Sequence, residues 1–315
     1  LKYVHAVICP ACNGARLNED ALSVRVQGKS IAEVVTWELN ELMLWMQSNT
    51  WGAVAREIID KIEAQVDLLQ DLGLGHLTLD RSSTSLRASE IQRIRVANQI
   101  LVPLSDVLYV FDEPSIGLHR EENERLIYHL KQLVEKGNTV IVVEHDLDTI
   151  TSADHIIELG PQAGVNGGEV LFNGAFSAFV QKEELQAISP TYRAIKYTRA
   201  ETQRRGEVFF SDLQSLKNTT DSMERKRPKG EVKASTKAAS SSIRLVGCRE
   251  RNLKNITVEF QLGQLNVVSG RSGAGKSSLV KGTLLKAVRQ QLGMDTGEPA
   301  KLTRHENLAA IKKTF

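Results

Sequence analysis

Residues 265–278, LNVVSGRSGAGKSS, decide how this chain folds. An apolar strand comes directly before the pattern G-x-x-x-x-G-K-S, and a segment of helical character follows it. The glycines let the backbone bend, so that successive N–H groups and the first turn of the helix point at a phosphate. The stretch therefore predicts a phosphate-binding loop between a buried strand and a helix, as in an α/β fold.

Particular side chains of this loop have predicted roles. Lys276 brings a positive charge to the phosphates, and the hydroxyl of Ser277 is a suitable ligand for Mg²⁺. A glycine-rich turn with an accidental Lys-Ser pair is the alternative, but the flanking strand and helix argue against it. The other predicted nucleotide-binding positions are Gly270, Ser272, Gly273, Ala274, Gly275 and Ser278.

Two further apolar stretches end in residues that suit phosphate chemistry. Residues 107–115, VLYVFDEPS, and residues 139–145, TVIVVEH, are separated by a helical segment, and this spacing predicts a parallel βαβ unit. Asp112 is predicted to hold Mg²⁺, Glu113 to polarise the attacking water, and His145 to reach the γ-phosphate. A helix cap for the acids and a structural role for the histidine are the alternatives.

Composition limits the class of protein. A chain of 315 residues with 41% hydrophobic and 25% charged residues is typical of a globular protein with two or three domains. No apolar run reaches the roughly 20 residues of a spanning helix, and a secretory pattern is lacking, so we expect a cytoplasmic protein without membrane contact. The net charge of +2 gives no argument for nucleic acid.

The cysteines suggest a metal site rather than disulfides. Cys9 and Cys12 form a CPAC knuckle, whereas Cys248 stands alone and is expected to be a small buried side chain. Tetrahedral zinc takes four ligands, and only His5 is a nearby candidate for a third. The sequence thus predicts a zinc-knuckle-like site with an incomplete ligand set.

Several stretches together resemble the UvrA-like excision-repair ATPases of the ABC superfamily. The resemblance covers residues 8–180 and 243–315 and implies an ABC-type core, a parallel sheet with flanking helices, that uses ATP and Mg²⁺. It also implies zinc modules with bound Zn²⁺, a homodimer, binding of damaged double-stranded DNA, and a UvrB-like repair partner. The stretches are CPACNGARL (9–17), residues 79–100, YVFDEPSIGLHREENERL (109–126), residues 138–170, GCRERNLKNITVEF (247–260) and VVSGRSGAGKSSL (267–279).

The resemblance implies an ABC signature loop at residues 86–92. UvrA-like signatures read Leu-Ser-Gly-Gly-Glu-x-Gln, whereas this chain reads LRASEIQ. Ser89, Glu90 and Gln92 stand at the positions implied to contact nucleotide. Side chains at the two glycine positions, Ala88 and Ser89, obstruct close backbone approach. We expect this loop to bind nucleotide weakly; supply of charge to the γ-phosphate by Arg87 is the alternative.

The order of the motifs predicts how the domains are divided. In an ABC domain the phosphate loop comes first, but here it follows the signature, the carboxylates and the histidine. We expect a signature subdomain with the CxxC knuckle (1–100), the C-terminal core of a first ATP-binding domain (101–185), a basic and partly disordered linker (186–242), and the start of a second ATP-binding domain (243–315). The chain alone is then expected to lack a complete ATP site; a circularly permuted single domain is the alternative.

The expected function follows from the resemblance and its departures. The leading hypothesis is part of a DNA-damage-recognition ATPase of nucleotide excision repair. A remnant or scaffold that binds nucleotide without turnover is the first alternative, because of the altered signature. A UvrA paralogue of the drug-resistance type, with another substrate, is the second.

Overall fold

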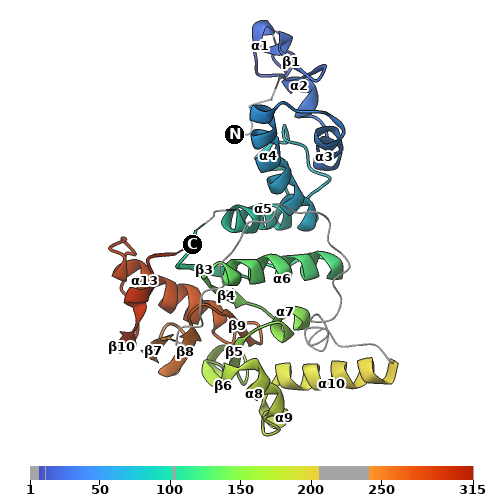
Figure 1. Cartoon of the computed structure of the whole chain (residues 1–315). Helices are drawn as coiled ribbons and strands as arrows, with labels where there is room; N and C mark the ends of the chain where they lie inside the picture. The colour runs from blue at the N-terminus through green and yellow to red at the C-terminus, as the bar shows by residue number, and fades with distance from the viewer. Residues whose placement is uncertain (1–6, 11, 102–103, 206–240, 315) are drawn as a thin grey trace. The chain divides into compact units, whose positions relative to one another are not determined.

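The computed structural model describes residues 7–10, 12–101, 104–205 and 241–314. The chain divides into two compact units, Leu1–Ala97 (unit 1) and Asn98–Phe315 (unit 2), and Figure 1 shows the elements of each. No helix in the described ranges is long and apolar enough to cross a membrane.

Unit 1 is mostly helical, and its core lies between two amphipathic helices, α3 and α4. The core is lined by Leu39, Leu42, Met43, Met46, Ile59, Val66, Leu74 and Leu77. The elements are α1 (Glu19–Ser23), β1 (Arg25–Val26), β2 (Lys29–Ser30), α2 (Ile31–Val34), α3 (Leu39–Ser48), α4 (Ala53–Asp71), the short helix η1 (Ser83–Ser85) and α5 (Ala88–Ile100).

Unit 2 is built on a sheet of six strands among its described residues, in the order β11-β3-β4-β9-β5-β6. The first five strands run parallel, and β6 is antiparallel to β5. A smaller antiparallel sheet has the order β10-β7-β8. The strands are β3 (Val107–Asp112), β4 (Thr139–Val143), β5 (His155–Gly160), β6 (Glu169–Ala175), β7 (Ser242–Cys248), β8 (Ile256–Gln261), β9 (Leu265–Gly270), β10 (Arg304–Glu306) and β11 (Lys313–Thr314).

Helices accompany these strands. Helix α6 follows a capping box at His119 and ends before Gly137, which has a φ of 85°. The helices are α6 (Arg120–Glu135), α7 (Leu147–Thr151), η2 (Gly164–Asn166), α8 (Phe176–Gln181), α9 (Leu185–Ile188), α10 (Pro190–Arg205), α12 (Lys276–Leu279), the π-helix η3 (Val280–Leu285), α13 (Lys286–Gln291) and η4 (Leu308–Ala310).

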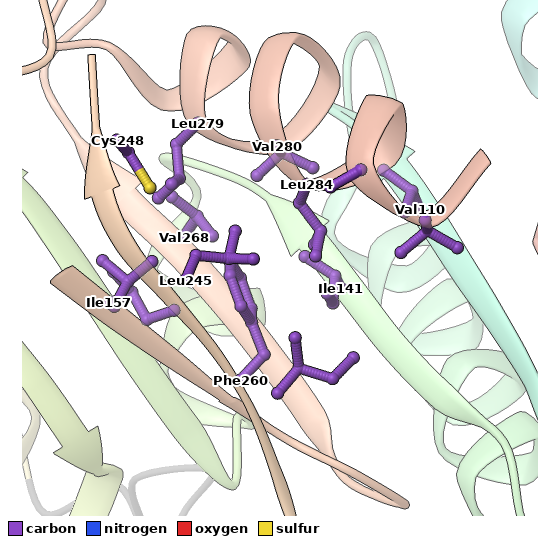
Figure 2. Packing of buried hydrophobic residues seen from close by; sticks show 14 of the residues in the cluster. Val110, Ile141, Ile157, Leu245, Cys248, Phe260, Val268, Leu279, Val280 and Leu284 are labelled. Carbon is purple, nitrogen blue, oxygen red and sulfur yellow. The ribbon is translucent and has the colours of Figure 1, made fainter. Parts of the chain in front are cut away.

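The central strands are apolar on both faces because the sheet is covered on both sides. Alternate residues of β3, β4, β9 and β5 point into one buried cluster with β7, β8 and the helical run that begins at α12. Figure 2 shows this cluster, in which Val110, Ile141, Val268 and Ile157 face Leu279 and Leu284. The prediction of an α/β core with a parallel sheet and flanking helices is confirmed.

The position of β9 differs from the expectation that residues 243–315 begin a separate domain. β9 lies between β4 and β5, and Val268 is in register with Val143 on one side and Ile157 on the other. All three strands are fully buried, so each needs backbone partners on both edges, and this order provides them. The phosphate-loop strand and the carboxylate strand therefore belong to one sheet.

The predicted linker, residues 186–242, begins with ordered structure. Residues 190–205 form helix α10, in which the side chains of Tyr192 and Ile195 are buried. Proline at the first position of α10 suits a helix start, since the missing N–H has no intrahelical partner there. Most of the basic segment, residues 206–240, lies outside the described residues.

Candidate nucleotide-binding site

The phosphate loop follows β9 and requires glycine at defined positions. Gly270, Gly273 and Gly275 have φ values of 128°, 77° and 108°, which L side chains rarely adopt. A Cβ on Gly270 would also lie 2.1 Å from the carbonyl oxygen of Leu159. These residues therefore allow the tight bend that brings the backbone toward a phosphate, as the sequence predicts.

Lys276 begins the helix after the loop, and its side chain is buried. Its Nζ donates to the carbonyl oxygens of Gly270, at 2.7 Å, and Arg271, at 3.2 Å. Burial lowers the pKa of Lys276, and the carboxylates of Glu113, Asp112 and Glu144 act in the opposite direction. Strands β3 and β9 lie on either side of β4, so the predicted carboxylates Asp112 and Glu113 and the phosphate loop are at the same edge of one sheet.

The outer side of the loop is hydrogen-bonded to two neighbouring segments. The N–H groups of Gly164 and Gly168 donate to the carbonyl oxygens of Gly273 and Ala274, each at 3.0 Å. The amide Nδ2 of Asn252 donates to the Gly273 oxygen at 3.1 Å. These bonds fix the path of the loop, and the sequence analysis did not identify Asn252 as a contributor.

Asp112 and Glu113 stand at the carboxyl end of β3. Asp112 is the last residue of the strand and is in register with Val143. The backbone turns at Glu113, which has a φ of 50° and donates its N–H to the Val143 oxygen at 2.9 Å. A left-handed conformation in a residue with a side chain is costly and is often kept at functional sites. The carboxylate oxygens of Asp112 and the hydroxyl of Ser277 suit the oxygen coordination of Mg²⁺.

His145 follows β4, and Glu144 positions its loop. The carboxylate of Glu144 is fully buried and accepts the N–H groups of Ser115, at 2.9 Å, and His145, at 3.0 Å. The Nδ1 of His145 lies 3.9 Å from an oxygen of Glu113. Glu144 thus connects the turn after Glu113 to the segment that carries His145. The sequence analysis missed it, although a charged residue directly after an all-apolar strand was the available signal.

The signature loop lies in unit 1, and Glu90 belongs to a local network there. Its carboxylate accepts the N–H of Arg87 at 2.7 Å and lies 3.2 Å from Nε2 of His76 and 3.7 Å from Arg81. The Arg87 N–H, followed by His76 and Arg81, holds the pKa of Glu90 below its usual range. The carboxylate stabilises the start of α5, and the implied nucleotide contact of Glu90 stays a prediction.

The backbone of the altered signature is regular. Ala88, Ser89 and Gln92 lie in the first turns of α5, and none of residues 87–89 is among the described residues with positive φ. Their side chains are compatible with this helix start, since only left-handed geometry demands glycine. The substitutions therefore change which groups the loop presents, without backbone strain.

The cysteine knuckle is present as a turn. The N–H of Asn13 donates to the Cys9 oxygen and that of Ala15 to the Cys12 oxygen, both at 2.8 Å. No group of three or more His, Cys, Asp or Glu side chains among the described residues is arranged to hold a metal ion. His5, the candidate for a third ligand, lies outside those residues. Two thiols alone do not fit a tetrahedral zinc site.

The three thiols are expected to differ in reactivity. Cys248 is fully buried, and burial raises its pKa to about 11. The N–H groups of Arg16 and Gly14 lower the pKa of Cys12. A thiol reagent such as Ellman's reagent at pH 8 should therefore modify Cys9 and Cys12 rapidly and Cys248 only after unfolding. A rapid phase that loses amplitude in Cys248→Ala would contradict this prediction.

The chain is similar to several known proteins along nearly its whole length. No family model matches the chain. It is 39% identical over 318 residues to UvrABC system protein A of Lactiplantibacillus plantarum, covering 99% of this chain and 29% of that protein. The proteins of the same name from Staphylococcus epidermidis and Mesorhizobium japonicum are each 36% identical, over 99% and 100% of this chain and 30% of each relative.

A solved structure gives the same relationship. The crystal structure of UvrA2 from Deinococcus radiodurans matches 91% of this chain and 33% of its own, with a TM-score of 0.51 and 32% identity. This chain spans about a third of the length of the proteins it matches. Its similarity to them extends over nearly all of its own residues, and it is therefore a UvrA-like sequence.

Proposed function

We propose that unit 2 binds ATP together with Mg²⁺. The observation that supports this most directly is the position of Asp112 at the carboxyl end of β3, with His145 following β4 and Lys276 following β9 in the same sheet. Ligands of open α/β sheets bind at this edge of the strands. Lys276 is hydrogen-bonded to the loop carbonyls of Gly270 and Arg271 and neutralises phosphate charge there.

The surrounding residues support phosphoryl transfer to water. When bound, Mg²⁺ would be held by Asp112 and Ser277 and would neutralise charge on the phosphate oxygens. Glu113 accepts a proton from the attacking water, and the hydrogen bond from its N–H to the Val143 oxygen holds its backbone at the end of β3. His145 donates to the γ-phosphate from the adjacent strand, and Glu144 positions it through the backbone.

We further propose that this ATP site serves nucleotide excision repair in the cytoplasm. The basis is similarity to proteins named UvrABC system protein A. The partners would be damaged double-stranded DNA, a UvrB-like protein and a second copy of the chain. Because this chain corresponds to about 30% of those relatives, these partners belong to the proposal. The proposal includes Zn²⁺ at Cys9 and Cys12 only if further ligands come from outside the described residues.

Nucleotide binding without turnover is the second candidate. The observation in its favour is the signature loop, where Arg87 replaces serine and Glu90 is committed to His76 and the Arg87 backbone. A signature of this kind offers fewer donors to the γ-phosphate, and each preorganised donor contributes about 2.7 to 4 kcal/mol to a transition state. Under this candidate function the phosphate loop binds nucleotide, but the protein does not hydrolyse it.

Phosphate release from saturating Mg·ATP separates the two candidates. If unit 2 hydrolyses ATP, Glu113→Gln should slow release about 100-fold, because general-base catalysis is lost, whereas fluorescent ADP should still bind. Glu121→Gln, an acid in the first turn of α6, is the matched control. Nucleotide binding without release in the unmodified chain would support the scaffold, and absence of binding would refute both.

A further inference from the structure

Lys281 lies in a helical turn of unusual geometry just beyond the phosphate loop. It is part of η3, Val280–Leu285, where the helix is widened to the π form; π-turns inside helices are often found at functional sites. The Thr283 hydroxyl donates to the Ser278 oxygen at 3.0 Å within this run. The Nζ of Lys281 lies 2.6 Å from Oδ2 of Asp112.

We propose that Lys281 competes with Mg²⁺ for the carboxylate of Asp112 and so sets the Mg²⁺ concentration at which nucleotide binds tightly. This inference rests on the proposed nucleotide site, in which Asp112 is a metal ligand. The same carboxylate oxygen accepts the ammonium group and is the kind of ligand that Mg²⁺ takes in ATP-binding proteins.

Burial explains why Lys281 can be displaced. Its side chain is 56% exposed, whereas that of Asp112 is 23% exposed. Lysine carries a hydrated point charge on a flexible stem, so its ammonium group exchanges a partly exposed carboxylate for water at small cost. Mg²⁺ gains more from that carboxylate, because it carries twice the charge of an ammonium group and binds carboxylate oxygens directly.

The two lysines near the loop therefore have different roles. Lys276 is buried and bonded to the Gly270 and Arg271 carbonyls, where it meets the phosphates. Lys281 is bonded to the predicted metal ligand, five residues further along the helical run. Loss of Lys276 should weaken nucleotide binding at every Mg²⁺ concentration. Loss of Lys281 should change only the Mg²⁺ concentration that nucleotide binding requires.

The test is a titration of Mg²⁺ at a fixed concentration of fluorescent ADP, in the full chain. In Lys281→Met, the Mg²⁺ midpoint for ADP binding is expected to fall about threefold to fivefold, which corresponds to the loss of one partly exposed ion pair. Lys281→Arg keeps a cation beside Asp112 and should retain the original midpoint. Lys286→Met, which removes the same charge further along the helical run, should do so as well.

A second background isolates the ion pair. The double variant Asp112→Asn, Lys281→Met should have the same Mg²⁺ midpoint as Asp112→Asn alone. Without the Asp112 carboxylate, Lys281 and Mg²⁺ no longer compete for a common ligand. Equal midpoints for the original chain and Lys281→Met would overturn the role of Lys281, while ADP binding that depends on Lys276 would leave the nucleotide site standing. Absence of ADP binding at saturating Mg²⁺ would overturn the nucleotide site and the inference with it.

Discussion

Substitution Lys276→Ala should reduce the affinity of this chain for ADP and ATP about 100-fold, which is about 2.7 kcal/mol. The ammonium group is buried and bonded to the loop carbonyls, so it is already held where phosphate oxygens arrive. Hydrogen bonds from a charged donor contribute more than neutral ones, and part of this bonding is lost with the side chain. Fluorescent ADP titrations of the two proteins measure the ratio directly.

Lys286→Ala is the matched control for that measurement. It removes a lysine from the helical run that begins at Lys276, and it should change ADP affinity less than about threefold, since distant charges are screened by salt. Thermal unfolding of both variants shows whether the loop variant is folded. Unchanged ADP affinity in a folded Lys276→Ala protein would mean that this loop is not a phosphate site.

The phosphate loop could be predicted because its requirements are local. Glycines at positions 270, 273 and 275, a lysine and an apolar strand are contiguous in the sequence, and the structure gives those glycines the backbone angles that they alone adopt readily. The strands β3 and β4 were equally clear, since short apolar runs bounded by polar residues suit a sheet covered on both faces.

The order of the strands could not be predicted from the same signals. Motif order placed Asp112 and Lys276 in different ATP sites, whereas the structure inserts β9 between β4 and β5. The pairing of Val143 with Val268 joins residues far apart in the chain. Any apolar parallel strand could form the same backbone hydrogen bonds with the edge of β4. Which strands pair in a sheet depends on contacts between distant parts of the chain, and the motifs contain little information about them.

Contacts between charged side chains were also beyond the sequence. Lys281 and Asp112 are distant in the chain and meet because η3 follows the phosphate loop over the sheet edge. The place of Glu90 in the signature likewise gave no indication that His76 and the Arg87 N–H are its partners. A motif fixes the type of side chain at a position, while its partners depend on tertiary packing.

Substitution Val268→Ala should destabilise the whole central sheet of unit 2 by about 2 kcal/mol or more. Val268 is fully buried in β9, in register with Val143 and Ile157, and it packs in the cluster shown in Figure 2. Since β9 lies between β4 and β5, the packing lost at Val268 should increase the rate of amide hydrogen exchange in all three strands together. Peptide-resolved exchange over residues 139–143, 155–160 and 265–270 measures this.

Met46→Ala supplies the comparison, because Met46 is equally buried but lies in the core of unit 1. It should raise exchange in α3 and α4 and leave residues 139–143 and 155–160 unchanged, since contacting residues couple and distant ones do not. If Val268→Ala raised exchange only within residues 241–314, then those residues would fold as a separate domain. The carboxylates of β3 and the phosphate loop would then belong to different sites, as motif order alone suggests.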